Sequence, residues 1–199
     1  AIELGGLTGT NSDDFTIGGS GSGSTTLIYS APAPEMLVLS GNFDLERSLS
    51  VNVVNGGINS GTSAILDITG PIDDGAFTAG LVKLGNGMLK LASGNTFSGG
   101  TTIEAGILSI PADSALGDST VPLTIDGGCL QPTASITMTR DLIFGSAGGS
   151  VRVDAPWVLE FPGDVAWGSG TVGFFGVGTT VFSGTSSGTG GDLWLGKPT

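Results

Sequence analysis

One stretch of the chain, residues 80–110, strongly limits what the chain can fold into. Apolar and polar residues alternate in short runs along it, and glycine-containing turns separate the runs. Side chains of a β-strand point alternately to opposite faces, so each run predicts a short strand with one buried face. A helical period of 3.6 residues does not fit these runs. The stretch therefore predicts several short strands, each of which turns a corner into the next.

The alternation assigns an inner and an outer face to these strands. Lys83 and Lys90 are expected to face solvent, because each stands between two apolar residues. Gly106 is expected to shift the alternation, as a bulge or a corner does. The residues expected to share one interior are Val82, Leu84, Leu89, Leu91, Ile103, Leu108 and Ile110.

This segment resembles the passenger-associated repeat, also called the autotransporter-associated β-strand repeat. The matching elements follow in order and are Leu81 to Lys83, Gly85 to Leu91, Gly94 to Phe97, Gly99 to Ile103, and Ala105 to Leu108. The close match covers about one sixth of the chain. The resemblance implies a right-handed, single-stranded parallel β-helix, which is a solenoid, on a bacterial surface or secreted protein. It implies a scaffold and brings no catalytic residues with it.

The rest of the chain is interpreted as the same all-β structure. Among 199 residues there are 37 glycines and 39% hydrophobic residues, a composition typical of many short strands and tight turns. A β-sandwich would have a similar strand count, but the repeat and a roughly 20-residue recurrence of apolar clusters favour the β-helix. We interpret residues 1–199 as a single domain of roughly ten coils. Residues 1–26 are expected to be irregular or capping, and residues 111–116 to form a helical turn with Asp113 as its cap.

Charge and residue usage exclude several classes of function. With 18 acidic and 6 basic residues the net charge is −12, which argues against nucleic acid and anionic lipid as partners. No apolar run is long enough for a transmembrane helix, so direct membrane insertion is not expected. Histidine is absent, which excludes a Ser-His-Asp triad and histidine-based zinc sites. Cys129 is the single cysteine and is interpreted as a small buried hydrophobe, with an intermolecular bridge or a reactive thiol as the alternative.

Acidic residues occur singly or in turn pairs, so we expect neither a metal site nor a cofactor. The pairs 13–14 and 73–74 are both Asp-Asp and are interpreted as solvated turns rather than calcium ligands. The basic residues at 140 and 152 are interpreted as members of surface ion pairs. The expected pairs are Arg140 with Asp141 and Arg152 with Asp154.

Aromatic residues gather in the C-terminal part, residues 157–195. Two interpretations stay open for them: a hydrophobic core and cap, or a surface for carbohydrate stacking or self-association. The residues of the candidate interaction surface are Trp157, Trp167, Phe174, Phe175 and Trp194.

These features favour a non-catalytic structural or adhesive module of a surface-exposed or secreted bacterial protein, similar to an autotransporter passenger. The alternative is a β-helical carbohydrate-active enzyme, such as a polysaccharide lyase or hydrolase, or a carbohydrate-binding module. No capping helix is predicted at either end, so head-to-tail association of copies is expected, with cell-surface carbohydrate as a further partner. No signal-peptide pattern is present, and the sequence is expected to be a mature or excised piece whose membrane-associated part lies elsewhere.

Overall fold

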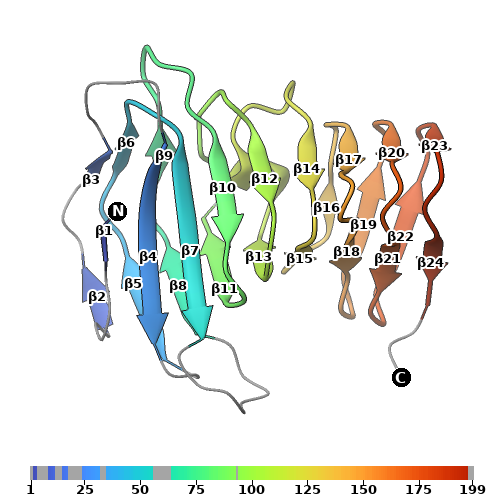
Figure 1. The fold of residues 1–199 in the computed structure, drawn as a ribbon, viewed down its shortest axis with the longest axis horizontal. Helices are drawn as coiled ribbons and strands as arrows, with labels where there is room; N and C mark the ends of the chain where they lie inside the picture. The colour runs from blue at the N-terminus through green and yellow to red at the C-terminus, as the bar shows by residue number, and fades with distance from the viewer. Residues whose placement is uncertain are drawn as a thin grey trace.

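The computed structural model of the chain describes residues 2–3, 9–11, 15–17, 24–31, 35–55, 64–92 and 94–196. The backbone winds into a rod of stacked coils that runs from β1 at the blue end to β24 at the red end (Figure 1). Neighbouring strands come from successive coils, and all the strand pairs of the described residues are parallel. The expected parallel β-helix is confirmed.

Two long sheets form the sides of the rod, and each has nine strands among the described residues. Sheet 1 consists of β1 (Ile2–Glu3), β4 (Thr25–Ala31), β7 (Leu49–Asn55), β10 (Leu81–Leu84), β12 (Thr101–Ile103), β14 (Leu123–Ile125), β17 (Leu142–Phe144), β20 (Val165–Trp167) and β23 (Ser186–Gly188). Sheet 2 consists of β2 (Gly9–Asn11), β5 (Met36–Leu39), β8 (Ile65–Ile68), β11 (Met88–Leu91), β13 (Ile107–Ile110), β15 (Cys129–Pro132), β18 (Gly149–Arg152), β21 (Val172–Phe175) and β24 (Leu193–Leu195).

Some coils contribute a third strand, and these strands form two short sheets. One consists of β3 (Phe15–Ile17), β6 (Phe43–Leu45) and β9 (Ile72–Asp73); the other consists of β16 (Ile136–Thr137), β19 (Val158–Phe161) and β22 (Thr179–Phe182). Sheets 1 and 2 imply nine coils, where the sequence predicted about ten. At about 4.8 Å per strand, nine coils give a rod roughly 40 Å long.

The core is a column of side chains between the sheets. Sheet 2 contributes one row of inward-pointing side chains that runs along the rod, with one residue from each coil. Successive residues of this row are register partners on adjacent strands. They are all buried and are Leu37, Leu66, Leu89, Leu108, Leu130, Val151 and Phe174. Leu91, Ile103 and Ile110 are buried as well. The predicted interior is therefore confirmed from Leu89 onward.

The first strand of the repeat has the opposite orientation to the predicted one. Lys83 is fully buried, and Val82 and Leu84 are half-buried on the outer side. The register decides this, because Lys83 lies between Val51 and Ile103, two buried residues of sheet 1. Within Leu81–Leu84 both orientations place apolar residues inside, so alternation alone could not choose between them. Lys90 is half-buried on the outer side, as expected for a residue facing away from the core.

Lys83 turns inward because its long side chain reaches a corner of the coil. Its Nζ donates to the carbonyl oxygens of Leu84 at 2.6 Å, Gly85 at 2.8 Å and Ala105 at 3.1 Å. Gly106 follows with φ +66°, a backbone conformation that favours glycine. Leu108 points inward again beyond it, so the predicted shift of alternation at this corner is confirmed.

Polar side chains at the corners connect successive coils. The buried Asn95 side chain accepts from Ile72 N at 3.0 Å and donates from Nδ2 to Ala115 O at 2.7 Å. It therefore contacts the coils before and after its own. The carboxylates of Asp126 and Asp141 each accept a backbone N–H one coil further on.

The predicted helical turn is a 3-10 helix, Asp113–Leu116. Its N-cap is Ala112, without a capping side chain, so the prediction that Asp113 caps it is wrong. Within the part of the chain that the structure describes, no helix is long and apolar enough to cross a bilayer.

Candidate functional site

The five aromatic residues predicted to form one interaction surface lie in different environments. Trp157 and Trp167 are partly buried and pack against the core. Phe174 is buried at 6% exposure and points inward. Phe175 and Trp194 lie on the outer side of sheet 2, with 37% and 61% exposure. The structure thus assigns three of these residues to the core and its margin and leaves two on the surface.

The inward aromatic residues belong to a cluster of phenylalanines. Phe174 meets Phe144 edge-on at 5.9 Å and Phe182 at 4.9 Å between ring centroids. Phe161 stacks on Phe182 at 5.5 Å. Such aromatic pairs add packing energy beyond the buried area alone. The core interpretation of the aromatic-rich part therefore holds for Phe174.

The outer side of sheet 2 carries a polar network beside Phe175. Asp154 Oδ1 accepts from Arg152 Nε at 3.0 Å, and Asp154 Oδ2 accepts from Gln131 Nε2 at 3.0 Å. This confirms the predicted ion pair of Arg152 with Asp154, whose side chains are 53% and 33% exposed. Arg152 and Phe175 are register partners on adjacent strands. Arg152 and Phe175 therefore project from adjacent strands on the same exposed side of sheet 2, with Cα atoms about 4.8 Å apart.

Arg140 differs from the prediction, because it lies inside the molecule at 2% exposure. Its Nε donates to Asp113 Oδ1 at 2.7 Å, so its ion-pair partner is Asp113 and not Asp141. Its Nη atoms donate to five carbonyl oxygens, those of Asp113, Leu116, Gly117, Asp118 and Val121. The side chain holds the loop around the 3-10 helix against the next coil, so its role is structural.

The acidic pair at 73–74 is also used within the fold. Asp74 is buried at 5% exposure, and its Oδ2 accepts from Ala79 N, Ser98 N and Ser98 Oγ at 2.7–2.9 Å. Although burial raises the pKa of Asp74, these hydrogen bonds give a net lowered pKa. The prediction of a solvated turn is therefore wrong for Asp74. Asp73 accepts from Thr96 Oγ1 and Gly75 N.

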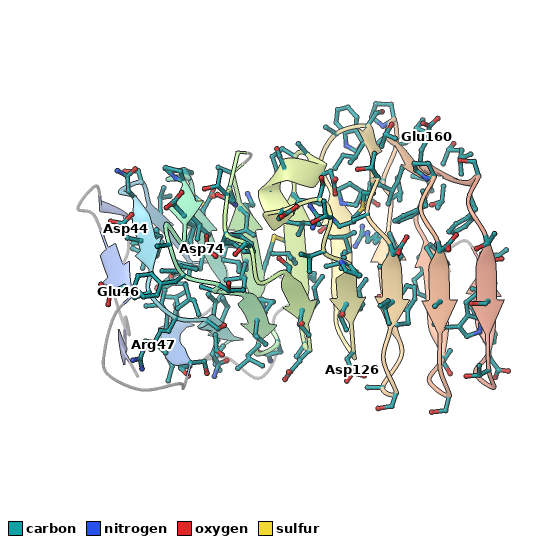
Figure 2. All side chains as sticks on the ribbon, turned by 90° about the horizontal axis from the view of Figure 1, so that it is seen from above. Asp44, Glu46, Arg47, Asp74, Asp126 and Glu160 are labelled. Atoms are coloured by element: carbon teal, nitrogen blue, oxygen red, sulfur yellow. The ribbon has the colours of Figure 1, made fainter. Side chains whose placement is uncertain are left out.

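The acidic residues that the structure describes are spread along the rod. Asp44 and Asp74 lie toward the N-terminal end of the rod, and Asp126 and Glu160 lie on opposite sides of later coils (Figure 2). A hollow of about 330 Å³ is lined by Asp44, Glu46 and the pair at 73–74, among other residues. Across the described residues, no three acidic, histidine or cysteine side chains are arranged to hold a metal ion. The pair at 13–14 lies outside the described residues.

Cys129 is half-buried on the outer side of sheet 2, in register with Ser150. Burial raises the pKa of its thiol. The expectation of a core position is therefore wrong, because Leu130 and not Cys129 points inward.

Lys83 gives a pH-dependent contribution to stability. Burial lowers its pKa from 10.5 to about 7. The unfolded chain keeps the higher pKa, so it binds more protons than the folded chain above pH 7, and the free energy of unfolding should rise with pH. We expect a rise of about 2–3 kcal/mol between pH 7 and 9 in urea denaturation.

The window ends at pH 9 because the raised pKa values of Cys129 and Tyr29 act in the opposite direction at higher pH. Lys83→Met is the control and should remove the rise. An equal rise in both proteins would show that Lys83 is not its source.

Sequence reasoning missed three buried polar residues that organise the coils: Lys83, Asp74 and Arg140. Lys83 had a signal, because it ends the first element of the match to the passenger-associated repeat, Leu81 to Lys83. Asp74 and Arg140 had none, since their partners are mostly backbone groups, together with the side chains of Ser98 and Asp113, and lie 5 to 27 residues away along the chain. A sequence separation of this size indicates a contact only once the number of residues per coil is known.

Residues 81–110 match the family model of the passenger-associated-transport-repeat. Together with the coil stack, this match defines the chain as a parallel β-helical protein in which residues 81–110 carry this repeat. Over 146 residues the chain is 33% identical to a protein of Brucella suis biovar 1 (strain 1330) named Adhesin BmaC autotransporter. The alignment covers 73% of this chain and 4% of that relative. No solved structure gives a significant match.

Proposed function

We propose that the chain is a non-catalytic, adhesive β-helical segment of an autotransporter-like passenger on a bacterial surface. The observation that carries the proposal is the match of residues 81–110 to the passenger-associated repeat, which lies within a continuous parallel β-helix. The relative named as an autotransporter adhesin supports it, although the chain spans only 4% of that relative's length.

The architecture suits such a role for a physical reason. Each coil hydrogen-bonds to its neighbours along the rod, so the coils support one another and the outer sides are free to carry varied side chains. Sheet 2 shows this plainly, because its inner row is apolar while its outer row mixes Asp67, Lys90, Gln131 and Arg152. A stable rod with a variable outer surface is a suitable support for recognition.

Adhesion is tested by coating beads with the purified chain and measuring their retention on cultured epithelial cells under flow. The control beads carry the chain attached covalently at several sites while unfolded in urea, so that it cannot refold on the bead. We expect retention of the folded chain well above the control. Equal retention of both would contradict an adhesive role for this segment, while the fold would be unaffected.

The alternative function, a polysaccharide lyase or hydrolase on the same fold, is tested separately. Acidic polysaccharides are incubated with the chain, with and without calcium, and new reducing ends or unsaturated products are measured. The proposal predicts no turnover in either condition. Turnover that scales with protein concentration would show that the segment is an enzyme.

We also expect the chain to associate head to tail. The last coil exposes Leu193 at 42% and Leu195 at 68%, beside an apolar cavity of about 220 Å³ that reaches Trp167 and Phe174. Apolar surface and an open strand edge at the end of a solenoid favour stacking of a further coil. Sedimentation should show an average mass that rises with concentration in the micromolar range. A monomer that persists over this range would contradict the expectation.

A further inference from the structure

We propose that the outer side of sheet 2 near the C-terminal end binds a carboxylated saccharide, with Phe175 as the stacking platform and Arg152 as the carboxylate ligand. This inference rests on the proposed adhesive function and assigns its recognition chemistry to one place. Four residues on neighbouring strands form the site: Arg152 and Gly173 with Phe175 and Trp194.

The ring of Phe175 lies flat on the sheet instead of standing away from it. The structure shows this through Gly173, because any Cβ at that position would collide with the Cζ and Cε2 atoms of the Phe175 ring. Gly173 has an ordinary backbone conformation, so a turn or a positive φ does not explain the glycine. Its missing side chain leaves room for the ring, and Phe175 is 37% exposed, so part of it remains accessible to a ligand.

Trp194 extends this aromatic surface toward the next coil. It is the register partner of Gly173 and is 61% exposed. Adjacent strands are about 4.8 Å apart, so the Trp194 side chain starts from the strand position next to Gly173, over which the Phe175 ring lies. Sugar rings present C–H faces that pack on aromatic rings, and the amphipathic indole adds an N–H donor.

Arg152 supplies a charge that is already oriented. Its Nε donates to Asp154, and Asp154 also accepts from Gln131, which fixes the plane of the guanidinium. Among the described residues, Asp154 is its only ion-pair partner, and the Arg152 side chain is 53% exposed. The two Nη nitrogens are therefore available to a ligand. A guanidinium edge with two parallel N–H groups matches a carboxylate.

These groups together select the class of ligand. An aromatic platform beside a guanidinium suits a ring with an apolar face and a carboxylate at one edge, which describes uronic and sialic acid residues. A neutral sugar would use the platform but leave the guanidinium without a partner. The chain's net charge of −12 weakens long-range attraction of anionic polymers, so binding is expected to depend on these local contacts.

The same combination does not occur elsewhere on the described outer side of sheet 2. Lys90 occupies the outer row three coils before Arg152 and interacts electrostatically with Asp67, but its register partner Ser109 is not aromatic. Phe77 is 52% exposed but lies in the acidic hollow near the other end of the rod. Lys90 and Phe77 therefore serve as matched controls for the charge and for the ring.

The experiment measures binding of two tetrasaccharides to the folded chain by NMR titration and calorimetry. One is an oligogalacturonate, and the other is its methyl-esterified, neutral counterpart. We expect the acidic tetrasaccharide to bind at least about tenfold more tightly than the neutral one in low salt. Sialyllactose and lactose form a second matched pair, which tests whether the carboxylate or the particular sugar is recognised.

Four substitutions assign the contacts. Arg152→Gln should remove the preference for the acidic ligand, and Phe175→Ala should weaken both ligands by roughly tenfold or more. Lys90→Gln and Phe77→Ala should leave binding unchanged. Each variant is checked for an unchanged melting temperature, so that a loss of fold is not mistaken for a loss of contact.

Gly173→Ala tests the platform itself, because its Cβ displaces the ring while Phe175 stays in place. We expect the Gly173→Ala variant to bind both ligands more weakly. The ratio of its affinities for the acidic and the neutral ligand should not change. Gly168→Ala is the matched control, since a Cβ at Gly168 meets no atom within 4 Å. A merely structural role for Gly173 would change stability but not binding by the folded protein.

The outcomes separate this inference from the proposed function. Failure of all four saccharides to bind, or equal binding of acidic and neutral members of each pair, would overturn the site. Cell adhesion that persists in Arg152→Gln and Phe175→Ala would also overturn the proposed site, but it would leave the adhesive function of the chain intact. Loss of adhesion in these two variants, together with the acid preference, is the result that we expect.

Discussion

Replacing Arg140 by Met is expected to lower the free energy of unfolding by about 3–5 kcal/mol, because it removes one partner of a buried ion pair. The guanidinium makes six hydrogen bonds, one to Asp113 Oδ1 and five to carbonyl oxygens. Met fills a similar volume but donates no hydrogen bond, so the buried carbonyls are left without partners. Urea denaturation of both proteins measures the loss.

Arg152→Met is the matched control, since Arg152 also pairs with an aspartate but is 53% exposed. Exposed ion pairs contribute little, and the expected loss is about 1 kcal/mol or less. Amide hydrogen exchange locates the effect: in Arg140→Met protection should fall first in residues 113–121. A similar small loss in both variants would contradict the structural role of Arg140.

Replacing Leu91 by Asp is expected to destabilise the chain by about 4 kcal/mol or more, which is exceptional for a single substitution. Leu91 is 3% exposed and is the register partner of Ile68, a fully buried residue. The new carboxylate would lie in the apolar column without a partner, and burial of an unpaired charge is strongly unfavourable. Met88→Asp is the control on the same strand, because Met88 is half-buried on the outer side.

The pH dependence of the Leu91→Asp deficit identifies its cause. Burial raises the pKa of the introduced carboxyl, so the folded chain binds more protons than the unfolded chain at intermediate pH. Stability of this variant relative to the parent should therefore recover as pH falls from 7 toward 4. A deficit that does not change with pH would indicate lost packing rather than a buried charge.

Most of the fold could be predicted from local pattern alone. Strand positions and the inward side of Leu89, Leu108 and Ile110 follow from alternation and glycine spacing. Alternation alone left the orientation of β10 open, because both of its faces carry apolar residues, and the polar character of Lys83 favoured the wrong one. Its inward position depends on three carbonyl oxygens that only the folded corner brings together.

The candidate site was predictable in part. Phe175 and Trp194 were identified as candidate surface residues by their aromatic character, and Arg152 by its acidic neighbour. Their proximity depends on the register of β18, β21 and β24, which follows from coil lengths of about 20 residues that vary from coil to coil. The register also separates Phe174 from Phe175, two neighbours in sequence that point to opposite sides of the same strand.

Successive coils of the rod lie in parallel register, and a single substitution tests this arrangement directly. Cys129 and Ser150 are register partners on β15 and β18. Adjacent strands are about 4.8 Å apart, a Cα separation that a disulfide accepts. Ser150→Cys should form an intrachain disulfide with Cys129 under mild oxidation, detected by mass spectrometry of the digested monomer. Ser109→Cys, whose partner is Gln131, should form none. A free Cys129 in Ser150→Cys, or equal linkage in both variants, would contradict the register and the fold built on it.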